Sequence, residues 1–348
     1  MSAIACTVAP DQSAERSAAL ARLNAPHAEP DELGRRMYGM KHAVSAEQLA
    51  ELREVNAFGG ANDEQIKRLM GLMGSNYSWY ASDPELRGKE GMLILSHGLG
   101  VQGDQKLRAS IQGSDIGQPA ALAFGMSMMT SQHIQLALDE LVAAGAERVV
   151  VVPVLSTYHN SLMRQWDFIF SRREQPEYAR VARIAGPASL HMVSALNDHP
   201  LVGSIVADHA REVSYDPELE EVIIVGHGPV DPEDNLEQLA MMENIADVVR
   251  RDRAYAAVHV ATLQDDAPRE VRMANFQALR QRIRNAEEAG RKMIVVTNLL
   301  GNRIVQSSLR RGLSGMGYRF NFKGLLEHED FIVWIKESAA EGLEVLRN

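Results

Sequence analysis

Cysteine is almost absent from the chain, because Cys6 is the single example among 348 residues. One thiol cannot form an intramolecular disulfide framework, and it cannot supply the repeated thiolates of a zinc knuckle or an iron–sulfur cluster. This composition is typical of a reducing compartment. The first residues also lack the charged leader and apolar core of a signal peptide. We therefore expect a cytoplasmic protein.

Long apolar runs and blocks of like charge are missing as well. The longest apolar segments, such as Arg148–Leu155 and Lys292–Leu300, fall far short of the roughly eighteen residues that span a bilayer. They are predicted to be strands, and no membrane span is expected. The net charge is −10, and no block of five or six like charges stands out. Binding to nucleic acid depends on clustered basic residues, so a nucleic-acid partner is not expected.

Two common motifs of catalysis are also absent. A nucleophile elbow needs glycine-x-serine-x-glycine between a strand and a helix, and no such turn occurs at the strands predicted here. A phosphate-binding loop needs a glycine-rich turn that ends in lysine and serine or threonine, which is missing too. These absences argue against serine-nucleophile and P-loop chemistry.

The sequence does contain an apolar run that ends abruptly on a histidine, MLILSHGLG at Met92–Gly100. This pattern predicts a buried parallel strand that delivers His97 to the carboxyl edge of a sheet, where ligands bind in open α/β folds. The pattern is repeated at Glu221–Asp231, EVIIVGHGPVD, which places His227 in the equivalent position. His227 is either a second functional residue or a remnant of duplication that only shapes a turn.

The order of predicted strands and helices is also repeated. The strand at Arg148–Thr157 precedes Tyr158 and His159 and matches the strand at Lys292–Leu300. Alignment of these strands without a gap places Arg303 opposite His159. Only the first half therefore presents two histidines, His97 and His159, at the ends of strands.

These patterns predict an α/β protein in three parts. Residues 91–212 and 213–348 are the two repeats, each with a parallel sheet. Residues 1–90 are predicted to be a helical extension without strands, with helices starting near Ser45 and Asn62. The first 30 or so residues are expected to be poorly ordered.

Two imidazoles at the edge of a sheet suit a borderline transition metal, or proton exchange near neutral pH. His97 and His159 are accordingly the candidate metal-binding and catalytic residues. The other histidines of the body of the chain are interpreted as packing or capping residues: His133, His191, His199, His209, His259 and His328.

The sequence resembles the class II tetrapyrrole chelatases, and it is most similar to their two-repeat forms. The matching segments run from about residue 91 to 345 and include LILSHG, GAERVVVVPVLSTYH, ALNDHPLV, VIIVGHGPVDPEDN and LLEHEDFIVWI. The resemblance implies two chelatase-like α/β domains that face each other across a cleft holding the macrocycle. It also implies that His97 and His159 hold an incoming divalent metal and accept the pyrrole protons.

The expected activity is that of a lyase-type chelatase that inserts Co²⁺ or Fe²⁺, as substrate, into a carboxylated tetrapyrrole such as sirohydrochlorin. No organic cofactor is expected. Tyr158 and His227 are candidate substrate-binding residues. Arg303 joins them, because a guanidinium cannot ligate a cation but binds carboxylates through two hydrogen bonds.

The sequence departs from the family at two places. Tyr158 puts a phenol beside the expected metal position, and Met126–Met129 replaces acidic residues that many members carry after the second strand. A non-catalytic metal- or tetrapyrrole-binding protein on the chelatase fold is therefore the alternative. An unrelated small-molecule enzyme on this fold also stays open. Internal duplication makes a monomer possible.

Overall fold

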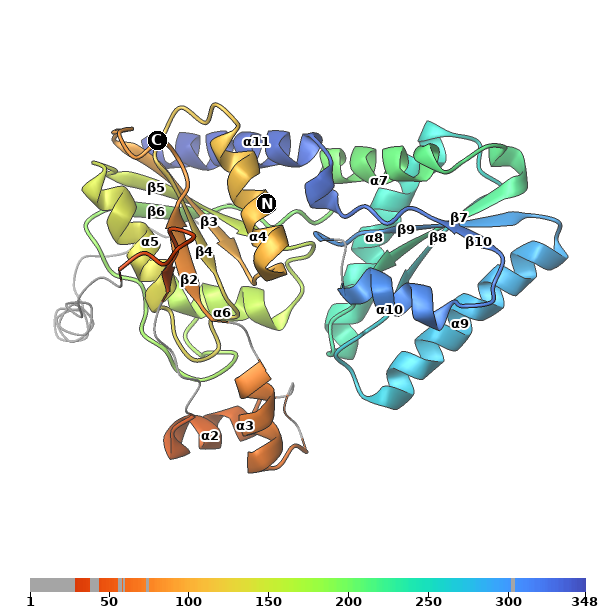
Figure 1. Ribbon diagram of the computed structural model, residues 1–348, viewed down its shortest axis with the longest axis horizontal. Helices are drawn as coiled ribbons and strands as arrows, with labels where there is room; N and C mark the ends of the chain where they lie inside the picture. The colour runs from red at the N-terminus through yellow and green to blue at the C-terminus, as the bar shows by residue number, and fades with distance from the viewer. Residues whose placement is uncertain (1–28, 38–43, 56–57, 59, 73–74, 302–303) are drawn as a thin grey trace. The chain divides into compact units, whose positions relative to one another are not determined.

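The computed structural model describes residues 29–37, 44–55, 58, 60–72, 75–301 and 304–348. The described chain forms two compact α/β units (Figure 1). The first unit contains the chain up to Val154 together with Ser161–Ser194 and Ile335–Asn348. The second unit contains Leu155–Asn160 and Ala195–Trp334. Each unit is built around its own sheet, as the duplicated strand pattern predicts.

The sheet of the first unit has the strand order β1-β2-β4-β3-β5-β6. β3, β4, β5 and β6 run parallel, whereas β1 and β2 are antiparallel additions at one edge. The central strands are almost completely buried, which explains their nearly continuous apolar sequences. The six strands are β1 (Arg36–Met37), β2 (Tyr77–Tyr80), β3 (Glu90–Ser96), β4 (Ala120–Phe124), β5 (Arg148–Val154) and β6 (Ser189–Met192).

The sheet of the second unit is parallel throughout and has the order β10-β9-β7-β8. In both units the first strand of the repeat lies at the centre of the sheet. The next strand along the chain lies on one side of it, and the chain then reverses direction to place the third strand on the other side. This reversal is the point where open α/β sheets bind ligands. It lies between β3 and β5 in one unit and between β7 and β9 in the other. The strands are β7 (Glu220–Gly226), β8 (Ala257–Thr262), β9 (Lys292–Thr297) and β10 (Tyr318–Phe320).

The helices connect these strands and begin where the local sequence favours a start. In α8, Pro232 occupies the first turn and the Asp231 carboxylate accepts hydrogen bonds from the next amides. His199 caps α7 by accepting the Leu201 N–H, one of the two roles, packing or capping, that the sequence favoured for it. The helices of the body are α4 (Gly100–Gln112), α5 (Gln132–Ala143), α6 (Ser161–Ile169), α7 (Pro200–Glu212), α8 (Pro232–Asp252), α9 (Arg269–Glu288), α10 (Ile304–Gly312) and α11 (Asp330–Arg347).

Residues 1–90 contain two helices at the positions of the expected cap signals and also two strands. Helices α2 (Ala46–Arg53) and α3 (Asp63–Leu72) begin at the predicted caps, Ser45 and Asn62. The expectation that this segment contains no strand is wrong, because β1 and β2 extend the first sheet. The aromatic residues of β2 pack against the neighbouring strand. The Trp79 indole, for example, is buried and packs edge-on against Phe124 of β4. Residues 1–28 lie outside the described part, and so does the expectation about their order.

Two helices fall on different sides of the division that the sequence suggests. α7 was expected in the first repeat, but it packs closely on α8 of the second unit: a Cβ at Gly203 would lie only 2.6 Å from the Val248 side chain. α11 was expected wholly in the second repeat, but from Ile335 it belongs to the first unit. There, a Cβ at Gly342 would lie 2.4 Å from Val150 of β5. Close helix packing therefore determines which unit each of these segments joins.

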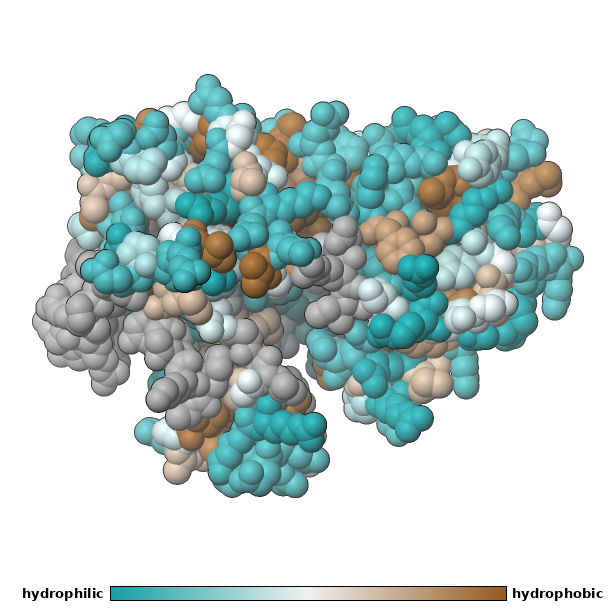
Figure 2. Space-filling model, in the orientation of Figure 1, coloured by the Kyte–Doolittle hydropathy of each residue, from teal (hydrophilic) through white to brown (hydrophobic). Residues whose placement is uncertain are grey.

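The face of the molecule drawn in Figure 2 is mostly polar, with hydrophobic residues scattered singly or in small groups. Isolated apolar residues of this kind are normal for soluble surfaces. Within the described ranges, none of the helices has both the length and the apolar character that a bilayer crossing requires.

Candidate functional site

His97 follows β3 directly, at the carboxyl end of the central strand of the first sheet. The turn His97-Gly98-Leu99-Gly100 leads into α4, and both glycines have positive φ angles, of 95° and 73°. Glycine adopts this backbone conformation without the strain that a Cβ would cause. The sequence pattern therefore places His97 correctly, and the His-Gly pair is explained by the sharp change of direction between strand and helix.

A buried carboxylate anchors this turn. Asp104 on α4 is 3% exposed, and its Oδ1 accepts the Leu99 N–H at 2.6 Å. Its Oδ2 accepts a hydrogen bond from the Tyr77 hydroxyl of β2. Burial raises the pKa of Asp104, and burial together with the adjacent carboxylate raises the pKa of Tyr77. Tyr77 therefore remains a hydrogen-bond donor over the physiological pH range.

His159 lies in a second turn, which follows β5, the neighbour of β3 in the first sheet. Its backbone N–H donates to the Thr157 hydroxyl at 3.1 Å. The preceding amide, of Tyr158, donates to the Asn197 side chain at 2.7 Å. The Tyr158 side chain is 37% exposed, and its ring lies edge-on to the His159 imidazole with 6.1 Å between the ring centroids. The candidate phenol and imidazole are thus adjacent.

The five candidate residues do not all fall in one unit. His97 belongs to the first unit, whereas Tyr158, His159 and His227 belong to the second. Arg303 lies outside the described residues. The joint action of His97 and His159 on one metal therefore stays a prediction, based on the order of the strands that precede them.

His227 follows β7, as predicted, at the point where the second sheet reverses its connections. Its Nδ1 is 3.2 Å from the Gly228 carbonyl oxygen, and its Nε2 is 3.5 Å from a carboxylate oxygen of Asp266. Gly228 has a φ of 82°, and a Cβ there would lie 2.7 Å from Thr262. The turn therefore requires glycine at position 228. The His227 imidazole is not explained by the turn alone, because it also lies near the Asp266 carboxylate.

Asn298 is a residue of interest that the sequence did not single out. It follows β9, and its N–H donates to the Val225 carbonyl at 3.0 Å, which holds it beside the end of β7. Its side chain is fully buried, and neither its nitrogen nor its oxygen has a hydrogen-bond partner among the described residues. Buried amides without partners are uncommon in folded proteins. An asparagine after an apolar strand is too ordinary a pattern to have indicated this.

The segment Met126–Met129 follows β4, at the place where the sequence departs from the chelatase pattern. Met128 and Met129 are buried in an apolar cluster with residues of α2 and α3. Between them and the strand, the Ser127 hydroxyl accepts a hydrogen bond from the Trp166 indole at 3.1 Å and lies 3.3 Å from His133 Nε2. Met128 and Met129 thus pack α2 and α3 onto the rest of the first unit.

At the end of β4, the backbone of Gly125 lies very close to the Asn76 side chain. Gly125 has a φ of 144°, and a Cβ there would lie 1.7 Å from Oδ1 of Asn76, which is buried. Gly125→Ala should therefore lower the free energy of unfolding by about 2–4 kcal/mol, because both the backbone and the buried Asn76 side chain must move. The matched control is Gly117→Ala, where φ is also positive but no heavy atom lies within 4 Å. Urea unfolding of both variants measures the difference, and equal losses of stability would contradict the steric argument.

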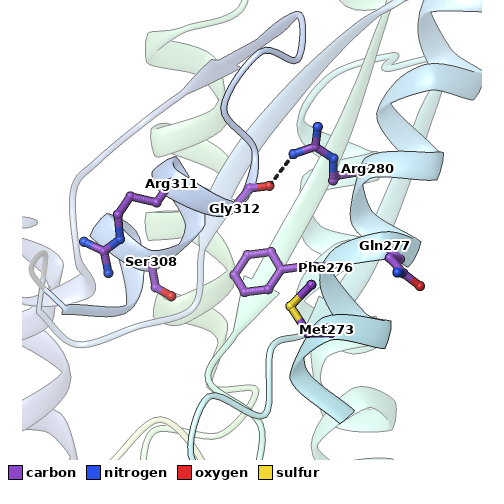
Figure 3. A pocket seen from close by; sticks show the side chains of 7 residues that line it. All are labelled: Met273, Phe276, Gln277, Arg280, Ser308, Arg311 and Gly312. Carbon is purple, nitrogen blue, oxygen red and sulfur yellow. Dashed lines mark hydrogen bonds between the residues drawn. The ribbon is translucent and has the colours of Figure 1, made fainter. Parts of the chain in front are cut away.

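A pocket of about 540 Å³ lies between α9 and α10, within the second unit (Figure 3). The Phe276 ring lies near the middle of the view, beside Met273 of the same helix, and Arg280 Nη1 donates to the Gly312 carbonyl at 2.7 Å. The remaining lining residues are Gln277, Ser308 and Arg311. No histidine or carboxylate lines this pocket. It is therefore unsuited to the metal chemistry predicted for the ends of the strands.

No cluster of three or more histidine, cysteine, aspartate or glutamate side chains suited to a metal ion occurs in the ranges that the structure covers. Each candidate histidine follows a parallel strand in the sequence: His97 follows β3, His159 follows β5 and His227 follows β7. Neutral imidazole can ligate a metal or accept a proton.

Comparison with known proteins finds solved structures that resemble this chain in fold. No family model matches the chain, and no curated protein matches it. Among solved structures, SirB from Bacillus subtilis with Fe³⁺ aligns with a TM-score of 0.51 and 17% identity, over 74% of this chain and 95% of SirB. DR2241 from Deinococcus radiodurans, a multi-domain protein with structural similarity to chelatases and two additional novel domains, aligns with a TM-score of 0.44 and 15% identity, over 72% of this chain and 56% of its own. The chain thus has a mixed α/β, parallel-sheet fold similar to that of SirB.

Proposed function

We propose that the protein is a metal chelatase that inserts Co²⁺ or Fe²⁺ into a carboxylated tetrapyrrole such as sirohydrochlorin. The observation that carries the proposal is the position of His97: an imidazole on an anchored turn, at the reversal point of a parallel sheet, in a chain with the fold of SirB. SirB was solved with Fe³⁺. The resemblance of the sequence to the class II chelatases supports the same reaction.

The proposed reaction exchanges one divalent cation for two protons. The metal forms bonds to the four ring nitrogens, and the two pyrrole N–H bonds break and release their protons. We propose that His97 and His159 act as transient ligands of the incoming metal and as acceptors of these protons. Two imidazoles release a metal more readily than a closed four-ligand site does, because fewer bonds must be broken.

A non-catalytic binding protein is the second candidate, and one observation favours it. Met126–Met129 occupies the position where many chelatases have acidic residues, and Met128 and Met129 are engaged in packing against α2 and α3. Such a protein would carry or sense a metal or a tetrapyrrole without inserting anything.

Incubation of the purified protein with sirohydrochlorin and Co²⁺ or Fe²⁺ separates the two candidates. Insertion changes the visible spectrum of the macrocycle, and a rate above that of the uncatalysed reaction supports the chelatase. A spectrum of bound ring or bound metal without turnover supports the binding protein. Absence of both turnover and binding, with every combination of metal and ring, would reject both candidates.

Arg303 is proposed to bind a carboxylate of the macrocycle, because its place in the second repeat corresponds to that of His159 in the first. Arg303→Met should weaken binding of the ring by about 1.5–3 kcal/mol, the range for a hydrogen bond to a charged group, while metal affinity stays nearly constant. Fluorescence titration of the metal-free ring into both proteins measures this. Equal affinities would contradict the role of Arg303, and a selective loss of metal affinity would mean that it acts on the metal side.

Tyr158 and His227 are proposed to contact the substrate as well. Tyr158 has the more direct argument, because its exposed ring lies next to the His159 imidazole. His227 is proposed from its equivalence to His97 in the repeat.

A further inference from the structure

The turn that carries His97 has little rigidity of its own. Two of its four residues are glycines, and the Gly98 N–H donates a long hydrogen bond, of 3.4 Å, to the Ser96 hydroxyl. Glycine loses more conformational freedom on ordering than any other residue. Leu99 occupies the N-cap position of α4, and its side chain makes no capping hydrogen bond. The conformation of this turn must therefore be maintained by residues outside it.

Asp104 supplies one such restraint. Its Oδ1 accepts the Leu99 N–H at 2.6 Å, and a hydrogen bond to a buried carboxylate is among the stronger ones in proteins. The Gly103 backbone also packs closely on Leu99, because a Cβ at Gly103 would lie only 2.6 Å from the Leu99 Cβ. Leu99 is thus fixed through its backbone hydrogen bond and this close packing, two residues after His97.

Tyr77 supplies the second restraint by fixing Asp104. Its hydroxyl donates to the other carboxylate oxygen, so both oxygens of Asp104 have a donor. The Tyr77 ring is itself fixed: it stacks on Phe124 with 5.0 Å between centroids, and the Arg35 guanidinium lies 4.9 Å from its centroid on another side. Arg35 is in turn paired with Asp31 at 2.7 Å. A continuous set of contacts therefore joins the segment before β1 to the His97 turn.

We infer that Asp104 and Tyr77 are positioning residues for His97, so that one residue of β2, Tyr77, supports the turn that carries the proposed metal ligand. The inference rests on the proposed function for its consequence, but the geometry that carries it is the hydrogen-bonded series Tyr77, Asp104, Leu99. Residues that orient metal ligands from outside the coordination sphere contribute to affinity because they remove alternative orientations of the ligand.

This role differs from a purely structural one in what it affects. A buried Tyr–Asp pair that only stabilised the fold would, when broken, lower stability and weaken all ligands together. A positioning pair affects the metal more than the ring, because His97 is the group that it orients. The KM for metal should rise, whereas the affinity for the metal-free tetrapyrrole should stay close to that of the wild type.

The test uses Tyr77→Phe and Asp104→Ala, with Asp104→Asn as the conservative variant and Tyr80→Phe as the matched control. Tyr80 lies on the same strand, but its hydroxyl donates to the Leu86 carbonyl instead. We expect the KM for Co²⁺ to rise about 10-fold for Tyr77→Phe and up to about 100-fold for Asp104→Ala, the range found for residues that support metal ligands. Asp104→Asn should recover part of the loss, because its amide oxygen still accepts one hydrogen bond. Tyr80→Phe should behave as the wild type.

A second measurement does not depend on chelatase activity. The ¹H–¹⁵N spectrum of the histidine side chains, with His97 assigned from His97→Gln, reports the environment of the imidazole in the full chain. In Tyr77→Phe and Asp104→Ala the His97 signals should shift or broaden, while those of buried His133 stay in place. If the wild type shows no insertion, the proposed function fails, and these signals still decide the positioning role. Unchanged His97 signals in folded Tyr77→Phe would overturn the inference, and so would equal losses of metal and ring affinity.

Discussion

His97→Ala is expected to lower metal-dependent activity by about 100-fold or more, the usual contribution of a positioned acid–base group or of a lost metal ligand. The same loss is expected for His159→Ala. Each imidazole follows a central strand of the first sheet along the chain, and alanine can neither ligate a metal nor accept a proton. Initial rates of metal insertion into sirohydrochlorin, measured at saturating ring and varied metal, give the effect.

His227→Ala provides the matched comparison, because His227 holds the same place in the second repeat. A loss within about 10-fold is expected, since a contact to substrate is less costly to remove than a ligand of the reacting metal. An effect of His227→Ala as large as that of His97→Ala would show that the second repeat contributes a ligand. Activity retained in His97→Ala would remove the basis of the metal-site proposal.

Acid should destabilise the protein before its carboxylates titrate, because two histidines are buried in the neutral form. Burial lowers the pKa of His133 to about 3 and that of His209 to about 4. Both values lie below the 6.5 of an exposed histidine, so the unfolded chain binds more protons between these limits. The stabilising effect of the neutral form is therefore complete above pH 6.5 and is lost as the pH falls toward 4.

His209→Phe isolates this effect. Both ring nitrogens of His209 are buried without a hydrogen-bond partner in the described structure, and the ring packs edge-on against His328 at 5.9 Å. The titratable side chains around it are Glu212, Glu327, Lys323 and His328. Phenylalanine keeps the ring contact and removes the titrating group. Relative to wild type, the variant should gain up to about 3 kcal/mol of unfolding free energy as the pH is lowered from 7 to 4.

Chemical unfolding of wild type and His209→Phe at a series of pH values measures that gain. The two curves should lie close together at pH 7.5 or show the variant as slightly more stable, because no hydrogen bond of the side chain is lost. Parallel curves across the whole range would mean that His209 does not titrate on unfolding. A variant that is less stable at every pH would mean that the imidazole makes a polar contact on which the fold depends.

Much of the fold could be predicted because its signals are local. The runs at Met92–Leu95, Val149–Val152 and Val222–Val225 consist of apolar residues whose side chains are all buried, so these strands could be predicted from composition. The duplication made His97 and His227 recognisable as equivalent strand ends. Cap signals located α2 and α3, since Ser45 and Asn62 accept hydrogen bonds within their own first turns.

The sequence did not indicate the strand at Tyr77–Tyr80. Its residues Tyr77, Ser78 and Trp79 are all buried, because β2 pairs with β4 on one side and is covered by the segment around Leu33. A short run with tyrosine, serine and tryptophan has neither the apolar composition of a central strand nor a clear alternation. Only its partners determine that it is a strand.

The sequence by itself determined the α/β class, the repeat, and the delivery of histidines to the ends of parallel strands. These properties depend on the order and periodicity of residues close together in the chain. Tertiary structure alone decided that Tyr77 reaches Asp104, 27 residues later, and that the Asn298 side chain is buried with no hydrogen-bond partner among the described residues. It also decided that α7 packs in the second unit and the end of α11 in the first. The physical reason is that these contacts join residues far apart in sequence, and their energy depends on complementary surfaces that no local pattern encodes.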